Sequence, residues 1–304
     1  MECKGFDGAV MLLPAGLRQT MYSLLTSDRR RAEEIRLRVG RCPAVVLPEG
    51  EIAGGSNPVT AADLAGVLDL ATGASVHAAR RSMAEGYVTA KGGYRVGICG
   101  TAVVQAGEVT GFRSLSSVSI RIPRQISVAG AGVLERLWEN GRFMSTILIA
   151  PPGCGKTTLL RDLIRRMASG SDPLRVALAD ERSEVAAVYE GRAQMDVGEK
   201  TDVMDGCPKA QACMLLLRAM NPQVIAMDEI TAPADIDAIT AAANCGVALL
   251  ATAHGNDPED LSRRALYRRL LETEVFHRAV GITVSGGSRV YRVFRREGHV
   301  WSEQ

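Results

Sequence analysis

The sequence predicts an α/β protein in which a smaller α+β N-terminal domain precedes a domain built on a mainly parallel sheet. In the second half of the chain, short and almost wholly apolar strands alternate with helical segments, as in doubly wound sheets. In the first half, strands of alternating polarity and glycine-punctuated strands predominate. A length of 304 residues also favours two domains over one. We therefore expect an N-terminal domain at 1–124, a linker at 125–144 and the second domain at 145–304.

Short-range patterns predict the elements of the N-terminal domain. A short helix is expected at 17–25, and the alternation of Glu34–Val39 favours a half-buried strand. A second apolar run, Ala44–Leu47, precedes a turn. Helical spacing over 60–71 begins at Thr60, a residue type typical of an N-cap. Further strands are expected at 86–91, 94–99, 102–105 and 114–122, with a hairpin turn at Gly92-Gly93.

The second domain is expected to begin after a helix-like stretch, Val133–Asn140, in the linker. A strand at 290–294 is expected to form a hairpin with the last core strand. The core strands are expected at 146–149, 176–179, 224–227, 247–252 and 281–284.

Charge and aromatic content exclude some partner classes. Lys and Arg number 36 against 34 Asp and Glu, a net charge of +2. Aromatic residues make up only 4% of the chain. A protein that binds nucleic acid or an anionic membrane in general would need a basic stripe, and a single-strand binder would need stacking aromatics. No direct binding of nucleic acid is therefore expected.

The spacing of the cysteines and the length of the apolar runs indicate in which cellular compartment the chain is expected. The seven cysteines form no C-x-x-C pair, so a disulfide framework or zinc site is not expected, and a reducing cytosol fits better. We expect most of them to be small apolar fillers. No apolar run approaches the roughly 20 residues that span a bilayer, and the apolar patch at 9–13 is too short for a signal peptide. A role at a membrane would then require other proteins to hold the chain there.

A glycine-rich loop lies between an expected strand and an expected helix of the second domain. It follows the pattern G-x-x-x-x-G-K-[ST], except that Ala150 stands at the first glycine. Glycines let backbone N–H groups turn inward around phosphate oxygens, and the following helix N-terminus favours the same anion. Because both flanking elements are present, nucleotide binding is favoured over a chance glycine-rich turn. The residues expected to bind ATP are Ala150, Pro151, Pro152, Gly153, Cys154, Gly155, Lys156, Thr157 and Thr158.

Two acids complete the expected site. Lys156 is expected to reach the β- and γ-phosphates, and the Thr157 hydroxyl to ligate Mg²⁺. Asp228 and Glu229 end an apolar strand, and parallel strands present their carboxyl ends at one edge of the sheet. Asp228 can hold Mg²⁺ through its water shell, and Glu229 can accept a proton from the attacking water. Without the loop, an ordinary acidic strand end would be the better interpretation.

Two further strands end in polar residues. Asp180 and Glu181 follow the strand at 176–179, where they could orient water or Mg²⁺ or form a solvated strand end with a local ion pair; both remain open. Thr252 and His254 end the strand at 247–252 and lie where a polar group can sense the γ-phosphate. We favour this sensor role for His254 over a structural one.

Several segments together resemble a known family. They are Ala150–Asp162, the turn Asp180–Glu184, Cys207–Ala210 and Arg218–Glu229. In combination they resemble the stage III sporulation protein AA family, ATPases of endospore-forming bacteria related to those of type II and type IV secretion and pilus machines. The resemblance extends from about residue 30 to the C-terminus.

The resemblance implies a fold, partners and a location. The fold is a RecA-like P-loop NTPase domain preceded by the smaller N-terminal domain, and the assembly is a homo-oligomer, a hexameric ring. The activity is ATP hydrolysis with Mg²⁺, driving a secretion-like channel between mother cell and forespore. The chain would lie in the mother-cell cytoplasm, peripheral at the inner face of the membrane, held there by membrane proteins of the channel.

The resemblance also implies site residues. Lys156, Thr157, Glu229 and His254 match family motifs, whereas Asp228 stands where the secretion ATPases more often have glycine. Arg121 and Arg124 resemble arginines that the related N-terminal domains present to nucleotide; Arg113 is a weaker candidate, and Glu184 matches an acidic motif only loosely. An arginine at the γ-phosphate stabilises developing charge. The alternative is that these arginines are solvated surface residues.

The leading hypothesis is an ATP-hydrolysing motor in which Lys156, Glu229, His254, Arg121 and Arg124 are catalytic. One alternative is a nucleic-acid-directed P-loop ATPase, which the charge and aromatic content disfavour. Another is an ATP-gated assembly scaffold, in which nucleotide orders subunit contacts and turnover is incidental.

Overall fold

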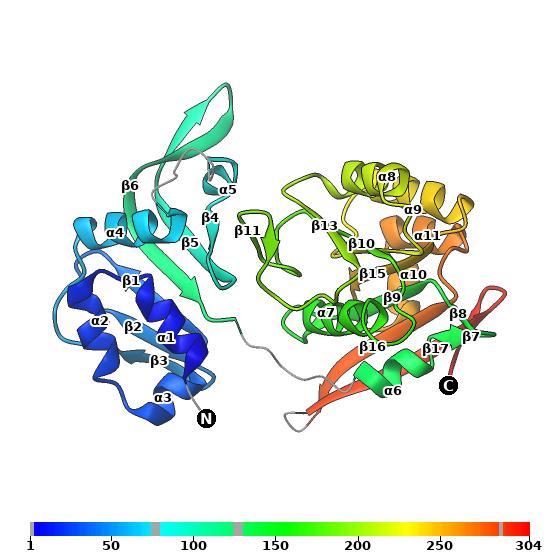
Figure 1. The fold of residues 1–304 in the computed structure, drawn as a ribbon, viewed down its shortest axis with the longest axis horizontal. Coiled ribbons are helices and arrows are strands. Elements are labelled where there is room, and N and C mark those ends of the chain that lie inside the picture. The colour runs from blue at the N-terminus through cyan, green and yellow to red at the C-terminus, as the bar shows by residue number, and fades with distance from the viewer. Residues whose placement is uncertain (1–2, 74–79, 124–129, 286–287) are drawn as a thin grey trace. The chain divides into compact units, whose positions relative to one another are not determined.

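The computed structural model describes residues 3–73, 80–123, 130–285 and 288–304 (Figure 1). Its contacts group the chain into two units. The first comprises Met1–Gln125 together with Ala187–Gln194, and the second comprises Ile126–Ala186 and Met195–Gln304. The chain therefore leaves the second unit after Ala186 and re-enters it at Met195. The domain bounds expected from the sequence, 1–124 and 145–304 with a linker at 125–144, stay a prediction.

The first unit is built on an antiparallel sheet with strand order β3-β2-β1-β6-β5-β4. Its strands are β1 (Glu34–Arg38), β2 (Ala44–Leu47), β3 (Gly50–Ala53), β4 (Tyr87–Ala90), β5 (Tyr94–Gln105) and β6 (Glu108–Arg121). Its helices are α1 (Lys4–Met11), α2 (Ala15–Tyr22), α3 (Thr26–Arg31), α4 (Ala61–Thr72) and α5 (Arg80–Ala84).

Helices α1, α2 and α4 bury one face of this sheet. Phe6, Leu17 and Leu64 from these helices form one core cluster with strand residues such as Ile35 and Ile120. Because successive strand residues point to opposite faces, the residues between these apolar positions lie on the face that the helices leave uncovered.

Most of the local expectations for the first unit are confirmed. The strands at 34–39 and 44–47 are β1 and β2, and Gly92-Gly93 turns β4 into β5. The Thr60 hydroxyl accepts a hydrogen bond from Asp63 N, and the Asp63 carboxylate accepts one from Thr60 N, which forms a capping box at α4. The strands expected at 94–99 and 102–105 are instead one continuous strand with register shifts, and α1 was not expected.

The second unit contains the sheet order β13-β10-β14-β15-β9-β16-β17-β18, parallel from β13 to β16 and antiparallel beyond. Its strands are β9 (Thr146–Ala150), β10 (Val176–Asp180), β13 (Thr201–Asp205), β14 (Val224–Met227), β15 (Ala248–His254), β16 (Arg278–Ser285), β17 (Ser288–Glu297) and β18 (Val300–Glu303). The mainly parallel sheet, its five expected core strands and the β16–β17 hairpin are therefore confirmed.

Helices cover this sheet on both faces. Helices α8 (Lys209–Ala219), α9 (Pro233–Asn244) and α11 (Ala265–Glu272) share one core cluster with strand residues such as Ile147 and Ile149. Helix α7 (Lys156–Met167) packs against β9 and β15 from the other side (Figure 1). The short helix α10 (Pro258–Ser262) follows β15.

The helix-like stretch expected at Val133–Asn140 is wrong in its second half. Helix α6 (Gly130–Glu135) is followed by a hairpin of β7 (Trp138–Glu139) and β8 (Arg142–Phe143). Asn140 and Gly141 turn this hairpin with φ angles of 50° and 74°. Asn-Gly is the preferred pair for a two-residue turn with both φ angles positive, so a local signal overrides the helical spacing.

The expectation that most cysteines are small apolar fillers is also wrong. Among the described residues Cys213 is the one buried cysteine, whereas Cys42, Cys99 and Cys245 are exposed and the others are partly covered. Composition does not reveal on which face of an element a cysteine lies. A second two-stranded hairpin, β11 (Val188–Tyr189) with β12 (Arg192–Ala193), lies in the segment grouped with the first unit. None of the described helices has the length and apolar character needed to cross a membrane.

Candidate functional site

Four parallel strands of the second unit bring their carboxyl ends to one edge of the sheet. Ala150 at the end of β9 pairs in register with His254 at the end of β15. Met227 at the end of β14 pairs with Ala251 of β15 and Ala179 of β10. The loop after β9 and the polar residues at the other strand ends therefore start from the same edge.

The loop after β9 takes a backbone shape that its glycines permit. Gly153 and Gly155 have φ angles of 76° and 93°, in the left-handed region that disfavours other residues. Gly155 is the N-cap residue of α7, whose first residue is Lys156. The open N–H groups of the first helical turn therefore face the loop, where they favour an anion.

Lys156 is a buried cation at the centre of the edge. Its side chain is covered, with the residue only 6% exposed. Its Nζ donates to the carbonyl oxygens of Ala150 at 3.0 Å and Pro151 at 3.3 Å, and lies 2.9 Å from His254 Nδ1. Burial lowers the pKa of Lys156, while the carboxylates of Glu229 and Asp228 act in the opposite direction.

His254 links the loop lysine to an acid. An ammonium group can only donate, so His254 Nδ1 accepts from Lys156 and the ring proton resides on Nε2. Nε2 lies 2.8 Å from Glu229 Oε1 and therefore donates to it. Direct hydrogen bonds from Lys156 through His254 to Glu229 therefore join the glycine-rich loop after β9 to the end of β14.

Hydroxyl groups hold the second acid. Thr157 Oγ1 donates to Asp228 Oδ2 at 2.9 Å, and Thr252 Oγ1 donates to Asp228 Oδ1 at 2.6 Å. The Thr252 hydroxyl also accepts from Glu229 N at 2.8 Å. Glu229 has a φ of 51°, a conformation that costs energy in a residue with a side chain and that the Thr252 bond helps to hold.

The solvated strand end expected as one alternative for Asp180 is wrong, because its carboxylate is buried among backbone donors. The residue is 1% exposed, and its carboxylate accepts from the backbone N–H groups of Glu184, Val185 and Ala186 at 2.8–3.2 Å. Burial raises the pKa of Asp180 to about 6, and the backbone N–H groups partly oppose that rise. Asp180 therefore holds the turn that follows β10. Beyond that turn, Met195 N donates to Ala186 O at 3.1 Å, where the chain re-enters the second unit.

Glu181 is engaged in the local ion pair that was the other possibility for this strand end. Its Oε2 lies 2.8 Å from Nζ of Lys209, the first residue of α8. A cavity of about 20 Å³, enough for one water, lies between this pair and the acids Asp228 and Glu229.

Two arginines at this edge were not expected from the sequence. Arg289 of β17 donates from Nε to Cys154 O in the loop at 3.0 Å. Arg161 of α7 donates to the carbonyl oxygens of Glu184 and Val185 at 2.8 and 2.5 Å. Arg289 contacts a residue 135 positions away, and no local sequence pattern predicts a contact over that separation. Arg161 lies one helical turn beyond Lys156–Thr158 on α7, which was the available signal.

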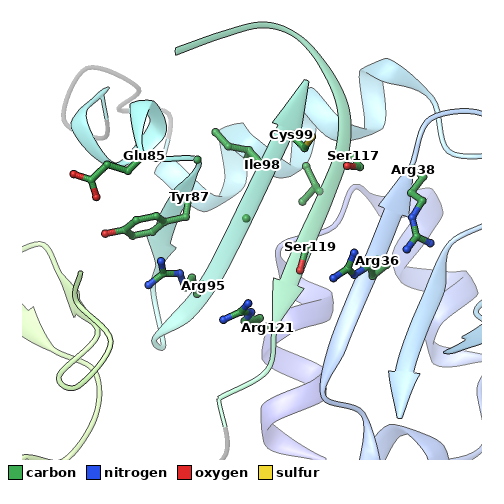
Figure 2. Close-up of a pocket in the computed structure, with 13 residues that line it drawn as sticks. Arg36, Arg38, Glu85, Tyr87, Arg95, Ile98, Cys99, Ser117, Ser119 and Arg121 are labelled. Atoms are coloured by element: carbon green, nitrogen blue, oxygen red, sulfur yellow. The ribbon is translucent and has the colours of Figure 1, made fainter. Parts of the chain in front are cut away.

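The arginines expected to reach nucleotide belong to the first unit or fall outside the described residues. Arg121, at the end of β6 (Figure 2), and Arg113, farther back on the same strand, are exposed residues of the first unit. Arg124 lies outside the described residues. The structure therefore brings together Lys156, Thr157 and the residues at the strand ends, and the arginine assignments stay predictions.

Comparisons with known proteins agree with this architecture. The family model described as "Sporulation stage III, protein AA" matches residues 7–301. Stage III sporulation protein AA of Bacillus subtilis (strain 168) is 34% identical over 295 residues, which are 96% of the chain and 95% of that protein.

Two solved structures share the fold. The ATPase DotB of Legionella pneumophila superposes with a TM-score of 0.57 at 15% identity, covering 91% of the chain and 78% of DotB. The pilus retraction motor PilT, solved with bound ADP, superposes with a TM-score of 0.58 at 18% identity, covering 86% of the chain and 78% of PilT. The second unit thus has the RecA-like fold that DotB and PilT share, and a smaller N-terminal domain precedes it.

Proposed function

Because the chain belongs to the sporulation stage III, protein AA family, we propose that it hydrolyses ATP as the motor of a secretion-like channel in endospore formation. The observation that carries the proposal is the hydrogen-bonded chain from Lys156 through His254 to Glu229. It joins a phosphate-binding loop to an acid that can take a proton, and both lie at one sheet edge. The likeness to DotB and PilT supports the fold that this function needs.

The loop supplies the binding of the triphosphate. Backbone N–H groups at Gly153–Lys156 and the N-terminus of α7 offer donors to phosphate oxygens. Lys156 is held at the loop by the carbonyl of Ala150, and it exchanges its hydrogen bond with His254 for one with a γ-phosphate oxygen. His254, released from the lysine, is then positioned to sense that phosphate.

Thr157 and Asp228 fit a magnesium ion. A hydroxyl and a carboxylate are oxygen ligands of the kind that Mg²⁺ prefers, and their oxygens already lie 2.9 Å apart. When bound there, Mg²⁺ neutralises charge that develops on the β- and γ-phosphate oxygens. Thr252 orients Asp228 by donating to its second oxygen.

Glu229 acts on the water. Its carboxylate is half-buried and is oriented by the ring Nε2–H of His254. It accepts a proton as water attacks the γ-phosphorus, and ADP leaves with the electron pair of the broken bond. Arg121, or Arg124, is proposed to reach the γ-phosphate and offset the charge that develops there.

Membership of the family also supports a proposal about the wider setting. We propose a hexameric ring in the mother-cell cytoplasm, held at the inner face of the membrane by proteins of the channel, with no direct binding of nucleic acid. The net charge of +2 supports this last point.

Replacing Glu229 with Gln tests the proposal. The amide keeps an oxygen that accepts from His254 but cannot take a proton, so ATP binding should persist while phosphate release falls about 10²–10⁴-fold. Lys156→Ala is the matched control and should lose binding as well. Binding is measured with a fluorescent ATP analogue and turnover by phosphate release. If Glu229→Gln still supports the channel in sporulating cells, an ATP-gated scaffold replaces the motor.

A further inference from the structure

The β16–β17 hairpin extends past the edge of the sheet at which β9 ends. Ile149, the last residue but one of β9, pairs with Gly281 of β16. Strand β16 then continues to Ser285, and the chain returns as β17. Arg289 of the returning strand pairs with Val284, beyond the last pair between β16 and β9. This part of the hairpin therefore lies beside the glycine-rich loop that follows β9.

Arg289 contacts two adjacent residues of this loop. Its Nε donates to Cys154 O at 3.0 Å. Its guanidinium also covers Gly155, because a Cβ built on that residue would lie only 2.6 Å from Arg289 Nε. Gly155 is therefore required for two independent reasons, its φ of 93° and the close approach of the arginine.

The bond to Cys154 O fixes the orientation of one peptide group of the loop. In a trans peptide, the C=O and the N–H that follows it point in opposite directions. The carbonyl of Cys154 faces Arg289, so the N–H of Gly155 points away from β17 and into the loop. None of the described residues accepts a hydrogen bond from this N–H, so it can donate to an anion. A hydrogen bond to the C=O also polarises the peptide and strengthens its N–H as a donor.

The charge of Arg289 lies on the outer side of this peptide group. A phosphate that accepts from the Gly155 N–H would be separated from the guanidinium by the peptide itself, and Arg289 could reach it only by giving up Cys154 O. On the inner side, Lys156 already supplies a cation, which the carbonyl oxygens of Ala150 and Pro151 hold. The geometry therefore favours a role for the hydrogen bond of Arg289 over a role for its charge.

We propose that Arg289 is a positioning residue for nucleotide binding, which holds the Cys154–Gly155 peptide with its N–H directed at the phosphates before nucleotide arrives. A donor that is already oriented costs less entropy on binding than one that must first be ordered. Arg289 then raises the affinity for the phosphates that ADP and ATP share. This role rests on the proposed function, which makes the loop a nucleotide site, and it adds a residue that lies outside the sequence motif of the loop.

Three substitutions separate the hydrogen bond of Arg289 from its charge. Arg289→Gln places an amide nitrogen at the position of Nε, so it keeps a donor and removes the charge. Arg289→Met has a side chain of the same length and supplies no donor. Arg289→Lys keeps the charge but places its donor one atom farther along the side chain. Arg292→Gln is the matched control, because Arg292 lies on the opposite face of the same strand.

The test measures the affinity of the full chain for ADP by calorimetry, which does not depend on turnover. We expect Arg289→Met to weaken ADP binding about 10-fold, and Arg289→Gln to bind within about 2-fold of Arg292→Gln. The KM for ATP should rise in Arg289→Met by the same factor while kcat stays the same, since the contact is equal in the ground state and the transition state. The midpoint of urea unfolding checks folding, and Arg289→Leu replaces Arg289→Met if that variant does not fold.

Two results would overturn the proposal. One is an equal loss of ADP affinity in Arg289→Gln and Arg289→Met, and full affinity in Arg289→Lys would then assign the effect to the charge. The other is ADP binding in Arg289→Met as tight as in Arg292→Gln. Either result leaves ATP hydrolysis by Glu229 untouched, and a chain that binds ADP without hydrolysing ATP would remove the proposed activity while leaving the role of Arg289 in place.

Discussion

Asp180 and Asp228 end neighbouring parallel strands of the same sheet, yet their surroundings differ. Asp180 accepts hydrogen bonds from three backbone N–H groups and is sealed from solvent. Asp228 accepts from the hydroxyls of Thr157 and Thr252. A backbone N–H group turns away only if the loop moves, whereas a hydroxyl rotates about one bond. The strand end at Asp180 is therefore committed to structure, and the one at Asp228 can exchange its partners.

This difference shows that the position of an acid at the end of a parallel strand does not define its role. Its role depends on the hydrogen-bond donors that the surrounding residues supply. After Asp180 the chain turns back so that Glu184–Ala186 direct their N–H groups at the carboxylate, and after Asp228 the φ of Glu229 directs a second acid into the site.

The largest expected effect is on stability. Asp180→Ala leaves three buried N–H groups without an acceptor, so the free energy of unfolding of the second unit should fall by about 3–5 kcal/mol. Asp228→Ala should cost about 1–2 kcal/mol, because its two hydroxyl donors can turn to water. Both tryptophans, Trp138 and Trp301, lie in the second unit, so their fluorescence in a urea titration reports it alone. Equal losses in the two variants would remove the contrast.

The pH dependence of stability gives the next effect. Burial raises the pKa of Asp180 to about 6 from 3.8, so the folded state binds its proton more tightly than the unfolded state does. The contribution is complete below about pH 4 and is lost as the pH rises through 6, about 3 kcal/mol in all. Unfolding titrations between pH 4 and 7 should show this slope, and Asp180→Asn should flatten it. An unchanged slope in Asp180→Asn would assign it to another group.

The smallest expected effect concerns activity at the other acid. Asp228→Asn keeps the size of the side chain and the hydroxyl contact but weakens the hold on Mg²⁺, so ATP turnover should fall about 10–100-fold. Higher Mg²⁺ should restore part of it. Turnover is followed by phosphate release over a Mg²⁺ series, with the urea midpoint as the check on folding. Full activity at low Mg²⁺ would show that Asp228 is as purely structural as Asp180.

Local patterns in the sequence predicted much of the fold. The strands Ala44–Leu47 and Val224–Met227 lie where their apolar runs placed them, and the N-cap at Thr60 is present. These features depend on neighbours within a few residues, which is the range at which a single sequence is informative. The Asn140-Gly141 turn is also a local feature, yet the prediction there followed the helical spacing over 133–140 and was wrong.

The parts of the fold and of the candidate site that were not predicted depend on contacts between segments distant in the sequence. β13 is short, polar and half exposed, so its pattern does not identify it as a sheet edge. The residue types at the candidate site could be read from motifs, but its internal bonds could not. The bridge made by His254 joins residues 98 and 25 positions away, and the φ of Glu229 follows from packing. For the same reason the sequence left two roles open for Asp180.

A backbone hydrogen bond from Met195 N to Ala186 O holds the two ends of the segment 187–194 together. With Asp180 holding the residues just before it, the segment leaves and returns at a single fixed point. A peptide attached in this way can be lengthened or shortened at little cost to the strand ends that hold it, although its contacts group it with the first unit. In evolutionary terms it is a place where insertions can accumulate while the strand ends nearby keep their geometry, and for the protein engineer it is a position for a tag or a reporter.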